Sequence, residues 1–216
     1  MAALVWDRVG ERFYESGVDH GVVYPMDESG AYPNGYAWNG LTTVTESPSG
    51  AEPTKLWADN IAYAEITSAE EFGLTIEAYM YPPKFGECDG SAEVKTGVMI
   101  GQQKRKKFGF SYRTKIGNDV DGLDKGYKLH LVYGCSAMPS EKGNSTINDS
   151  PDATTFSWEV KTTPAEVTGY KPTSHIVIDS TKVDPGKLAE FLKTLYGGSG
   201  EPTLPNPDAV IAAFAE

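Results

Sequence analysis

The stretch Lys107-Phe-Gly-Phe-Ser-Tyr-Arg-Thr-Lys-Ile116 alternates large apolar or β-branched side chains with polar or small ones along its whole length. Successive side chains of a β-strand point to opposite faces, so this period of two is typical of a strand with one buried face. Phe108, Phe110 and Tyr112 are therefore expected in a core. Asn118 and Asp119 follow, and both residue types favour turns. The segment predicts a chain that is mainly β.

Working outward, other segments show the same alternation. Residues 127–133 place Tyr127, Leu129, Leu131 and Tyr133 on one face, and further strands are predicted at 155–162, 72–81, 36–45, 55–66 and 175–179. The 55–66 segment is interrupted by the turn pair Asp59-Asn60. About seven strands are therefore expected.

Two helices are predicted near the end of the sequence. Asp184-Pro185 and Asn206-Pro207 each combine a capping residue with proline at the first helical position. The first predicted helix spans 185–196, carries an apolar stripe and ends at Gly197. The domain organisation that follows is an arm or long hairpin at 1–35, a β-sandwich domain at 36–196, and a glycine hinge with a short helix at 197–216.

The charge balance limits the partners of this chain. It carries 19 basic and 30 acidic residues, a formal net charge of −11, which argues against a general nucleic-acid binder because such proteins neutralise phosphates with Lys and Arg. The two cysteines, Cys88 and Cys135, form neither a disulfide framework nor a zinc motif, so both are expected as free thiols. The sequence predicts no membrane-spanning helix and no signal peptide at its start.

No catalytic, cofactor or metal site is expected. Nucleotide-binding and hydrolase motifs are missing from the sequence, and His130 lies within a predicted strand, where a structural role is the default. The neighbours Glu70 and Glu71 would point to opposite faces of a strand. The loop with Asp119, Asp121 and Asp124 lacks the spacing and the final Glu of an EF-hand.

One basic segment differs from the acidic remainder. Six of the 19 basic residues fall within positions 104–115, where no acid occurs: Lys104, Arg105, Lys106, Lys107, Arg113 and Lys115. Three interpretations are open. The charges could protect a solvated strand edge, could form an assembly interface with acidic surface on another copy of the chain, or could contact nucleic acid. In the second case Lys107, Arg113 and Lys115 are expected to point away from any channel that the copies enclose.

Aromatic residues leave a second function class open. Four tryptophans and 12 tyrosines could stack on sugar rings, as in carbohydrate-binding β-sandwich modules. Such residues are also common as core side chains or as anchors of oligomer interfaces.

Long stretches of this sequence resemble the major tail tube protein of long-tailed, non-contractile bacteriophages. The resemblance covers nearly all of the chain from about residue 4 onward. It rests on these stretches: Ala31-Tyr-Pro-Asn-Gly-Tyr-Ala-Trp-Asn-Gly-Leu-Thr-Thr-Val-Thr45, Glu46-Ser-Pro-Ser-Gly-Ala-Glu-Pro-Thr54, Trp57-Ala-Asp-Asn60, Glu70-Glu-Phe-Gly-Leu-Thr-Ile-Glu-Ala-Tyr79, Gly101-Gln-Gln103, Phe108-Gly-Phe-Ser-Tyr-Arg-Thr-Lys-Ile-Gly-Asn-Asp119, Thr155-Phe-Ser-Trp-Glu-Val160 and Val177-Ile-Asp-Ser-Thr-Lys-Val-Asp-Pro185.

The resemblance implies a β-sandwich or half-barrel protomer with a flanking helix, whose inner barrel is completed by oligomerisation. Six copies would form a ring, and rings would stack into the tail tube of the virion after synthesis in the host cytoplasm. A tape-measure protein would fill the tube during assembly, tail terminator or distal tail proteins would meet its ends, and genomic DNA would later pass through the lumen without specific binding. The family has no catalytic residues, so no enzymatic activity, cofactor or membrane partner is implied.

Overall fold

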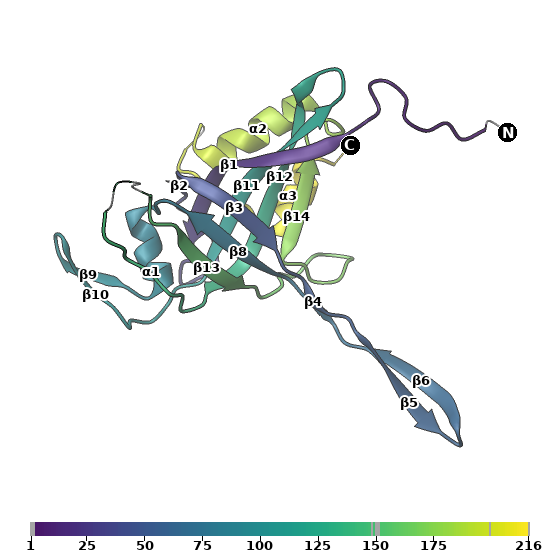
Figure 1. Cartoon of the computed structure of the whole chain (residues 1–216), viewed down its shortest axis with the longest axis horizontal. Helices are drawn as coiled ribbons and strands as arrows, with labels where there is room; N and C mark the ends of the chain where they lie inside the picture. The colour runs from purple at the N-terminus through teal and green to yellow at the C-terminus, as the bar shows by residue number, and fades with distance from the viewer. Residues whose placement is uncertain (1–2, 148, 150–151, 199, 216) are drawn as a thin grey trace.

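The structure of the 216-residue chain is a computed structural model that describes residues 3–147, 149, 152–198 and 200–215. The protein is mainly β, and its strand pairs are antiparallel, as the sequence predicts (Figure 1). The first sheet contains β2 (Tyr36–Trp38), β1 (Tyr14–Pro25), β11 (Phe108–Asn118), β12 (Gly122–Ala137) and β14 (His175–Asp179). The second sheet continues from the end of β12 through β13 (Phe156–Lys161), β8 (Gly73–Ala78) and β3 (Leu41–Glu46).

The long strand β12 belongs to both sheets and bends between them. Residues up to Val132 pair with β14, whereas Ser136 and Ala137 pair with β13. Between these stretches Gly134 adopts a φ of +61°, and a Cβ atom at this position would lie 2.1 Å from the Thr163 carbonyl oxygen. Only glycine accommodates both the left-handed backbone and this close approach. The bend places the second sheet over one face of the first.

An aromatic core fills the space between the two sheets. Trp38, Phe85, Phe110 and Trp158 are buried there, and the Trp38 and Trp158 rings meet edge to face with centroids 5.3 Å apart. Phe108, Phe110 and Tyr112 of β11 are buried, as the sequence predicts. Cys88 lies in the same core, is free, and has its pKa raised to about 12 by burial. Cys135 is likewise buried and free, as the sequence predicts.

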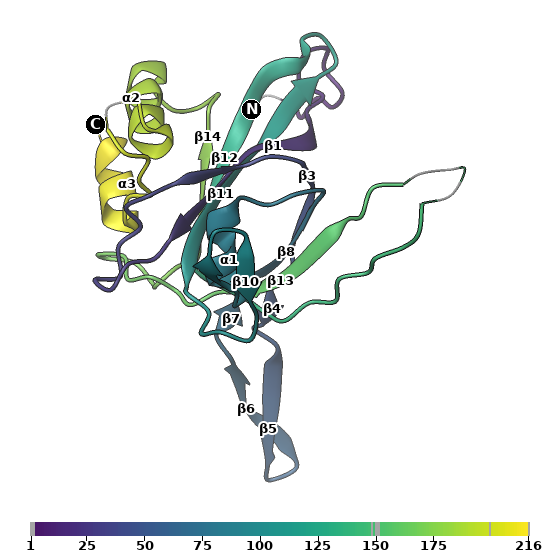
Figure 2. The ribbon, with the colours of Figure 1, turned by 90° about the vertical axis from the view of Figure 1, so that its left-hand side faces the viewer.

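Two helices cover the other face of the first sheet (Figure 2). Helix α2 spans Pro185–Tyr196 and helix α3 spans Pro207–Ala213, so both predicted helices are confirmed. The Asp184 carboxylate accepts a hydrogen bond from the Lys187 backbone N–H at 2.8 Å, which caps α2. The apolar stripe of α2 packs on the predicted β12 face, and the buried side chains include Leu129, Leu131, Tyr133, Leu188, Phe191 and Leu195.

The C-terminal segment is fastened to the body of the protein. Gly197 ends α2 in a left-handed conformation, Leu204 forms a bridge with Tyr32, and Val210 of α3 is buried with α2. The predicted hinge at 197–200 includes residue 199, which lies outside the described residues.

The predicted arm at 1–35 is too long. Residues 14–25 form β1, which pairs with β11 along its length and contributes Val22, Val23 and Tyr24 to the buried cores. The sequence does not indicate this strand, because the first half of β1 is polar and exposed. The alternative prediction, a long hairpin, is closer to the structure, because β1 and β2 pair with each other. Residues 3–13 alone extend away from the body as an arm (Figure 1).

The structure has 14 strands in the described chain instead of about seven, because several lie in hairpins and short pairs. Gly40, with a φ of +73°, divides the predicted 36–45 strand into β2 and β3. The predicted 55–66 hairpin exists as β5 (Pro53–Ala58) and β6 (Ile61–Thr67), and it is joined to the body by β4 (Ser49–Gly50) and β7 (Glu70–Glu71). The segment after β8 forms η1 (Pro83–Phe85), α1 (Gly86–Asp89) and the pair β9 (Ala92–Lys95) and β10 (Val98–Ile100).

None of the helices in the described ranges is long and apolar enough to cross a membrane.

Candidate functional site

The six basic residues singled out in the sequence do not form one patch. Lys104, Arg105, Lys106 and Lys107 precede β11, whereas Arg113 and Lys115 lie in its second half. At about 3.3 Å per residue along a strand, the six and eight positions from Lys107 to Arg113 and Lys115 correspond to roughly 20–26 Å.

Two residues of the first group are neutralised by acids of the same chain. Arg105 forms an ion pair with the buried Asp89 at 3.3 Å, and Lys106 forms one with Glu87 at 2.6 Å. The hydrogen bond with Glu87 raises the pKa of Lys106. Lys107 donates a hydrogen bond to the Thr163 hydroxyl at 2.9 Å. These contacts fasten the segment to α1 and to the loop after β13.

Arg113 is also engaged within the chain. Its guanidinium donates a hydrogen bond to Asp19 at 2.9 Å and lies over the Tyr127 ring, 4.6 Å from the centroid. Burial would raise the pKa of Asp19, but the hydrogen bond and charge of Arg113 outweigh it, so this pKa is lowered. Lys104 and Lys115 are exposed and form no ion pair with the described residues. Lys107 is also exposed, and its described contact is with the neutral Thr163 hydroxyl, so Lys104, Lys107 and Lys115 are the members of the six whose charge is available to a partner.

The most prominent surface feature is the hairpin formed by β5 and β6, which projects far from the body (Figures 1 and 2). Every residue of both strands is exposed. Trp57 is 69% exposed and Tyr63 is 72% exposed, and Leu56, Ile61 and Ile66 are exposed near them. A two-stranded hairpin is only marginally stable alone in water. Its exposed apolar side chains would be stabilised by contact with another surface that shields them from water.

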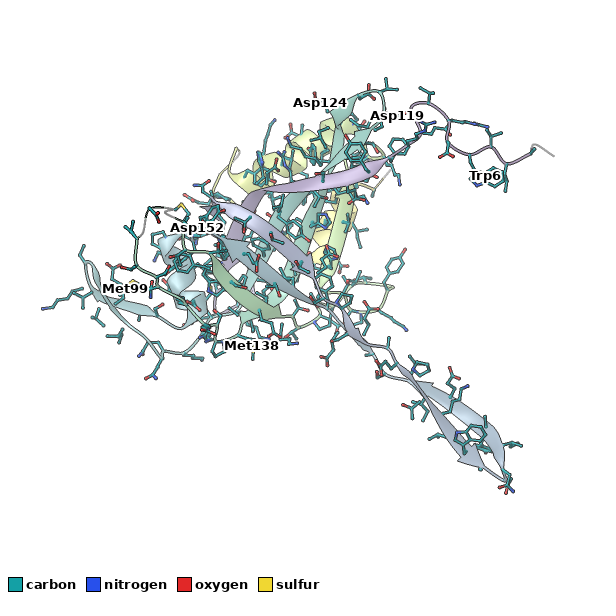
Figure 3. The ribbon with its side chains drawn as sticks, in the orientation of Figure 1. Trp6, Met99, Asp119, Asp124, Met138 and Asp152 are labelled. Atoms are coloured by element: carbon teal, nitrogen blue, oxygen red, sulfur yellow. The ribbon has the colours of Figure 1, made fainter. Side chains whose placement is uncertain are left out.

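The N-terminal arm is a second apolar projection. Leu4, Val5, Trp6, Val9 and Phe13 are all exposed along it. Figure 3 labels Trp6 far from the sheets, near the free end of the arm.

The arm is attached at the turn between β11 and β12. The Asp119 carboxylate accepts a hydrogen bond from the Gly10 backbone N–H at 3.0 Å, and the Asn118 amide donates one to the Gly10 carbonyl at 3.2 Å. Asp121 forms an ion pair with Lys125 at 3.3 Å. The sequence suggested a loose likeness of this loop to a calcium site. In the structure Asp119 binds the arm and Asp121 binds Lys125.

A third apolar projection is the short hairpin of β9 and β10. Val94, Val98, Met99 and Ile100 are exposed on it, and Figure 3 shows Met99 on the opposite side of the body from the arm. The three projections therefore reach outward in different directions.

The outer face of the second sheet is open and polar. The side chains that alternate with the buried core residues of β3, β8 and β13 are Thr43, Thr45, Thr75, Glu77, Ser157, Glu159 and Lys161. Lys161 forms an ion pair with Glu159 at 3.0 Å, whereas Glu77 has no ion-pair partner among the described residues. The helices cover the first sheet instead.

One side-chain cluster was missed by the sequence analysis. Glu46, His130 and His175 bring three potential metal-ligand atoms within 4.8 Å of one another, from three strands. Each residue is isolated in the sequence, so no local spacing could have indicated the cluster.

No protein-family model matches this chain, and the comparison with curated proteins gives no match.

Proposed function

We propose that this chain is a self-assembling structural protein that forms six-membered rings, which stack into a bacteriophage tail tube and so make a conduit for genome delivery. The observation that carries the proposal is the set of three apolar projections around a well-packed body. A monomer that kept them in water would expose clustered aromatic and aliphatic side chains. Contacts between copies would bury them.

The β5–β6 hairpin gives the strongest support. Its backbone hydrogen bonds lie between its own two strands, and its tip carries the exposed Trp57 and Tyr63. Aromatic side chains of this kind are the usual anchors of protein interfaces. A second copy of the chain presents the same projections, and repeated head-to-tail contacts of this type generate rings and then stacks.

The second sheet is suited to line the lumen. Strand β3 is an edge of the sheet and offers unpaired backbone groups to a neighbour. If six copies each contribute β12, β13, β8 and β3, a barrel of about 24 strands results, with a diameter of roughly 48 Å at the backbone. Such a wall leaves room for duplex DNA.

The polarity of this face fits a conduit. Lys and Arg side chains that pair with phosphates would hold the DNA, and the affinity would grow with each contact. The open face carries threonine, serine and glutamate with one paired lysine, Lys161. Arg113 belongs to the first sheet and is engaged with Asp19 and Tyr127, away from this face. The lining proposed here would let DNA and a tape-measure protein pass.

A carbohydrate-binding module remains the alternative. Sugar recognition by aromatic stacking needs rings arranged in a binding face. Trp38 and Trp158 are buried in the core, and Trp6 and Trp57 stand on separate projections. This distribution favours assembly.

The test is electron microscopy and sedimentation of purified protein at increasing concentration. Wild-type protein is expected to form rings or tubes. The double variant Trp57→Ser, Tyr63→Ser should remain monomeric with an unchanged melting temperature, because both side chains are exposed. Tyr170→Ser is the matched control, since Tyr170 is 76% exposed on a loop outside the projections. Wild-type protein that stays monomeric and is retained on glycans would overturn the proposal in favour of the alternative.

A further inference from the structure

The cluster of Glu46, His130 and His175 joins the two sheets of the protein. Glu46 ends β3 opposite Leu74, so its side chain is on the core side of the second sheet. His130 lies in β12 and His175 begins β14, both in the first sheet. The cluster thus connects the sheets at the point where the chain leaves β3 for the projecting β5–β6 hairpin.

The three ligand atoms have the spacing of a metal site. Glu46 Oε1 lies 3.3 Å from His130 Nδ1 and 3.7 Å from His175 Nε2. The two histidine nitrogens are 3.1 Å apart. Tetrahedral Zn²⁺ with bonds of about 2.0–2.1 Å requires separations of about 3.3–3.4 Å between its ligand atoms. We propose that these residues form a His₂Glu site for Zn²⁺.

Neighbouring groups orient the proposed ligands. His130 Nε2 lies 3.0 Å from the Thr114 hydroxyl oxygen, so an N–H on Nε2 can donate to it and leave Nδ1 free to bind the ion. The Tyr112 hydroxyl donates a hydrogen bond to Glu46 Oε1 at 2.6 Å. Such outer contacts are typical of protein metal sites, where they fix the tautomer of the histidine and the direction of the carboxylate.

Aromatic rings hold the two imidazoles. The Tyr112 ring is stacked on His130 with an interplanar angle of 6°, and the Phe72 ring is stacked on His175 at 25°. The fourth position of the ion can face a surface cavity of about 430 Å³ that is lined by Glu46, Phe72 and His175. Water can enter from this cavity and complete a tetrahedral site.

The ion must replace a hydrogen bond between the imidazoles. The ring centroids are 5.3 Å apart and the ring planes differ by 12°, so the line that joins the two facing nitrogens runs nearly through both ring centroids. Zn²⁺ at about 2.05 Å from both would lie about 1.3 Å from that line, which requires each ring to turn by about 40°. His175 is at the cavity wall and can turn towards it, whereas the buried His130 must lengthen its contact with Thr114 as it turns. This rearrangement makes the expected affinity weaker than that of a pre-formed structural site.

Bound Zn²⁺ would brace the root of the hairpin against the first sheet. The test is a titration of the full-length protein at pH 7.5 with ZnCl₂, followed by calorimetry and by thermal unfolding. One ion is expected per chain, and a 100-fold excess over the dissociation constant should raise the melting temperature by about 5–10 °C. Hydrogen exchange of the β4 and β7 amides should slow with Zn²⁺.

Variants separate this site from incidental binding. His175→Gln and Glu46→Gln should each weaken Zn²⁺ binding at least tenfold, and both residues border the cavity, so the fold should persist. His20→Gln is the matched control, because His20 is the third histidine of the chain and lies outside the cluster. Wild type and His175→Gln binding Zn²⁺ equally, or wild type binding none, would overturn the site. Neither result depends on whether the protein forms tubes.

Discussion

At the residue scale, the chain uses basic side chains to fasten its own strands. Arg113 of β11 reaches Asp19 of the neighbouring strand β1, and the two side chains are 18% and 31% exposed. Partial burial makes this pair stronger than an exposed ion pair, although part of the gain is offset by desolvation. Lys115, two residues further along the same strand, is exposed and has no such partner in the described chain.

Replacing Arg113 by Met should therefore destabilise the protein at neutral pH by about 1 kcal/mol. The pKa of Asp19 is lowered from 3.8 in the folded protein, so the stabilisation by the pair is present above that pH and is lost as the pH falls through the lower folded value. Urea unfolding at pH 7 and at pH 2.5 measures this. The difference between wild type and variant should shrink at the lower pH, while Lys115→Met should match wild type at both.

A variant that loses as much stability at pH 2.5 as at pH 7 would show that Arg113 acts through packing on Tyr127 instead of through the charge of Asp19.

At the element scale, the bend of β12 decides how the two sheets face each other. Gly134 and Gly122 both have a φ of +61°, but their surroundings differ. A Cβ at Gly134 would meet the Thr163 backbone, whereas nothing lies within 4 Å of a Cβ at Gly122. The two glycines therefore separate the cost of the backbone conformation from the cost of crowding.

Gly122→Ala should cost about 1 kcal/mol, which is the strain of a left-handed alanine. Gly134→Ala should cost about 3 kcal/mol more, because the methyl group must displace backbone at the sheet junction. Chemical denaturation of both variants tests the comparison. Equal losses of stability in the two variants would mean that the backbone at the sheet junction can shift to accommodate a methyl group. The bend would then not depend on the close approach of Gly134 to Thr163.

At the scale of the whole molecule, the boundary of the arm decides which truncations leave a folded protein. Residues 3–13 have exposed apolar side chains and two hydrogen bonds to the β11–β12 turn through Gly10. Residues 14–25 are a strand of the first sheet. Burial of Val23 and Tyr24 cannot be replaced by any other part of the chain.

Deleting residues 1–13 should leave a monomer whose melting temperature lies within a few degrees of wild type, but it should abolish ring or tube formation. Deleting residues 1–30 should prevent folding, because β11 loses the strand that pairs with it. Circular dichroism and electron microscopy of the two truncations test this. Normal tubes from the shorter truncation would exclude the arm from assembly, and a folded longer truncation would contradict the assignment of β1 to the sheet.

How far the sequence predicts this fold depends on how local each signal is. The alternation in β11 and β12 and the capped apolar stripe of α2 lie within single elements, and the predicted apolar side chains of all three are buried or half-buried. The prediction of a single buried face is wrong for β11 and β12, because alternating residues such as Ser111 and His130 are buried as well. Strand β1 escaped prediction because its first half is exposed and its buried residues are a short run before Pro25. The short strands β4, β7, β9 and β10 carry no periodic pattern long enough to detect.

The candidate interaction surfaces also combine features that the sequence shows with features that only the fold decides. Apolar residues of the 55–66 hairpin are visible in the sequence, but their exposure depends on the absence of a facing sheet, which is a property of the whole fold. The basic stretch at 104–115 is equally visible. Its partners Asp19, Glu87 and Asp89 are distant in sequence, so the ion pairs could not be foreseen.

The sequence by itself determined the β-rich class, the two capped helices, the free cysteines and the inward faces of the central strands, because each depends on neighbours within a few residues. The tertiary structure alone decided that β12 serves two sheets, that Arg105, Lys106 and Arg113 of the basic stretch are neutralised internally and that Glu46, His130 and His175 meet. These features depend on strand register and on sheet curvature. Both are set by contacts between segments that are tens of residues apart, which no local pattern encodes.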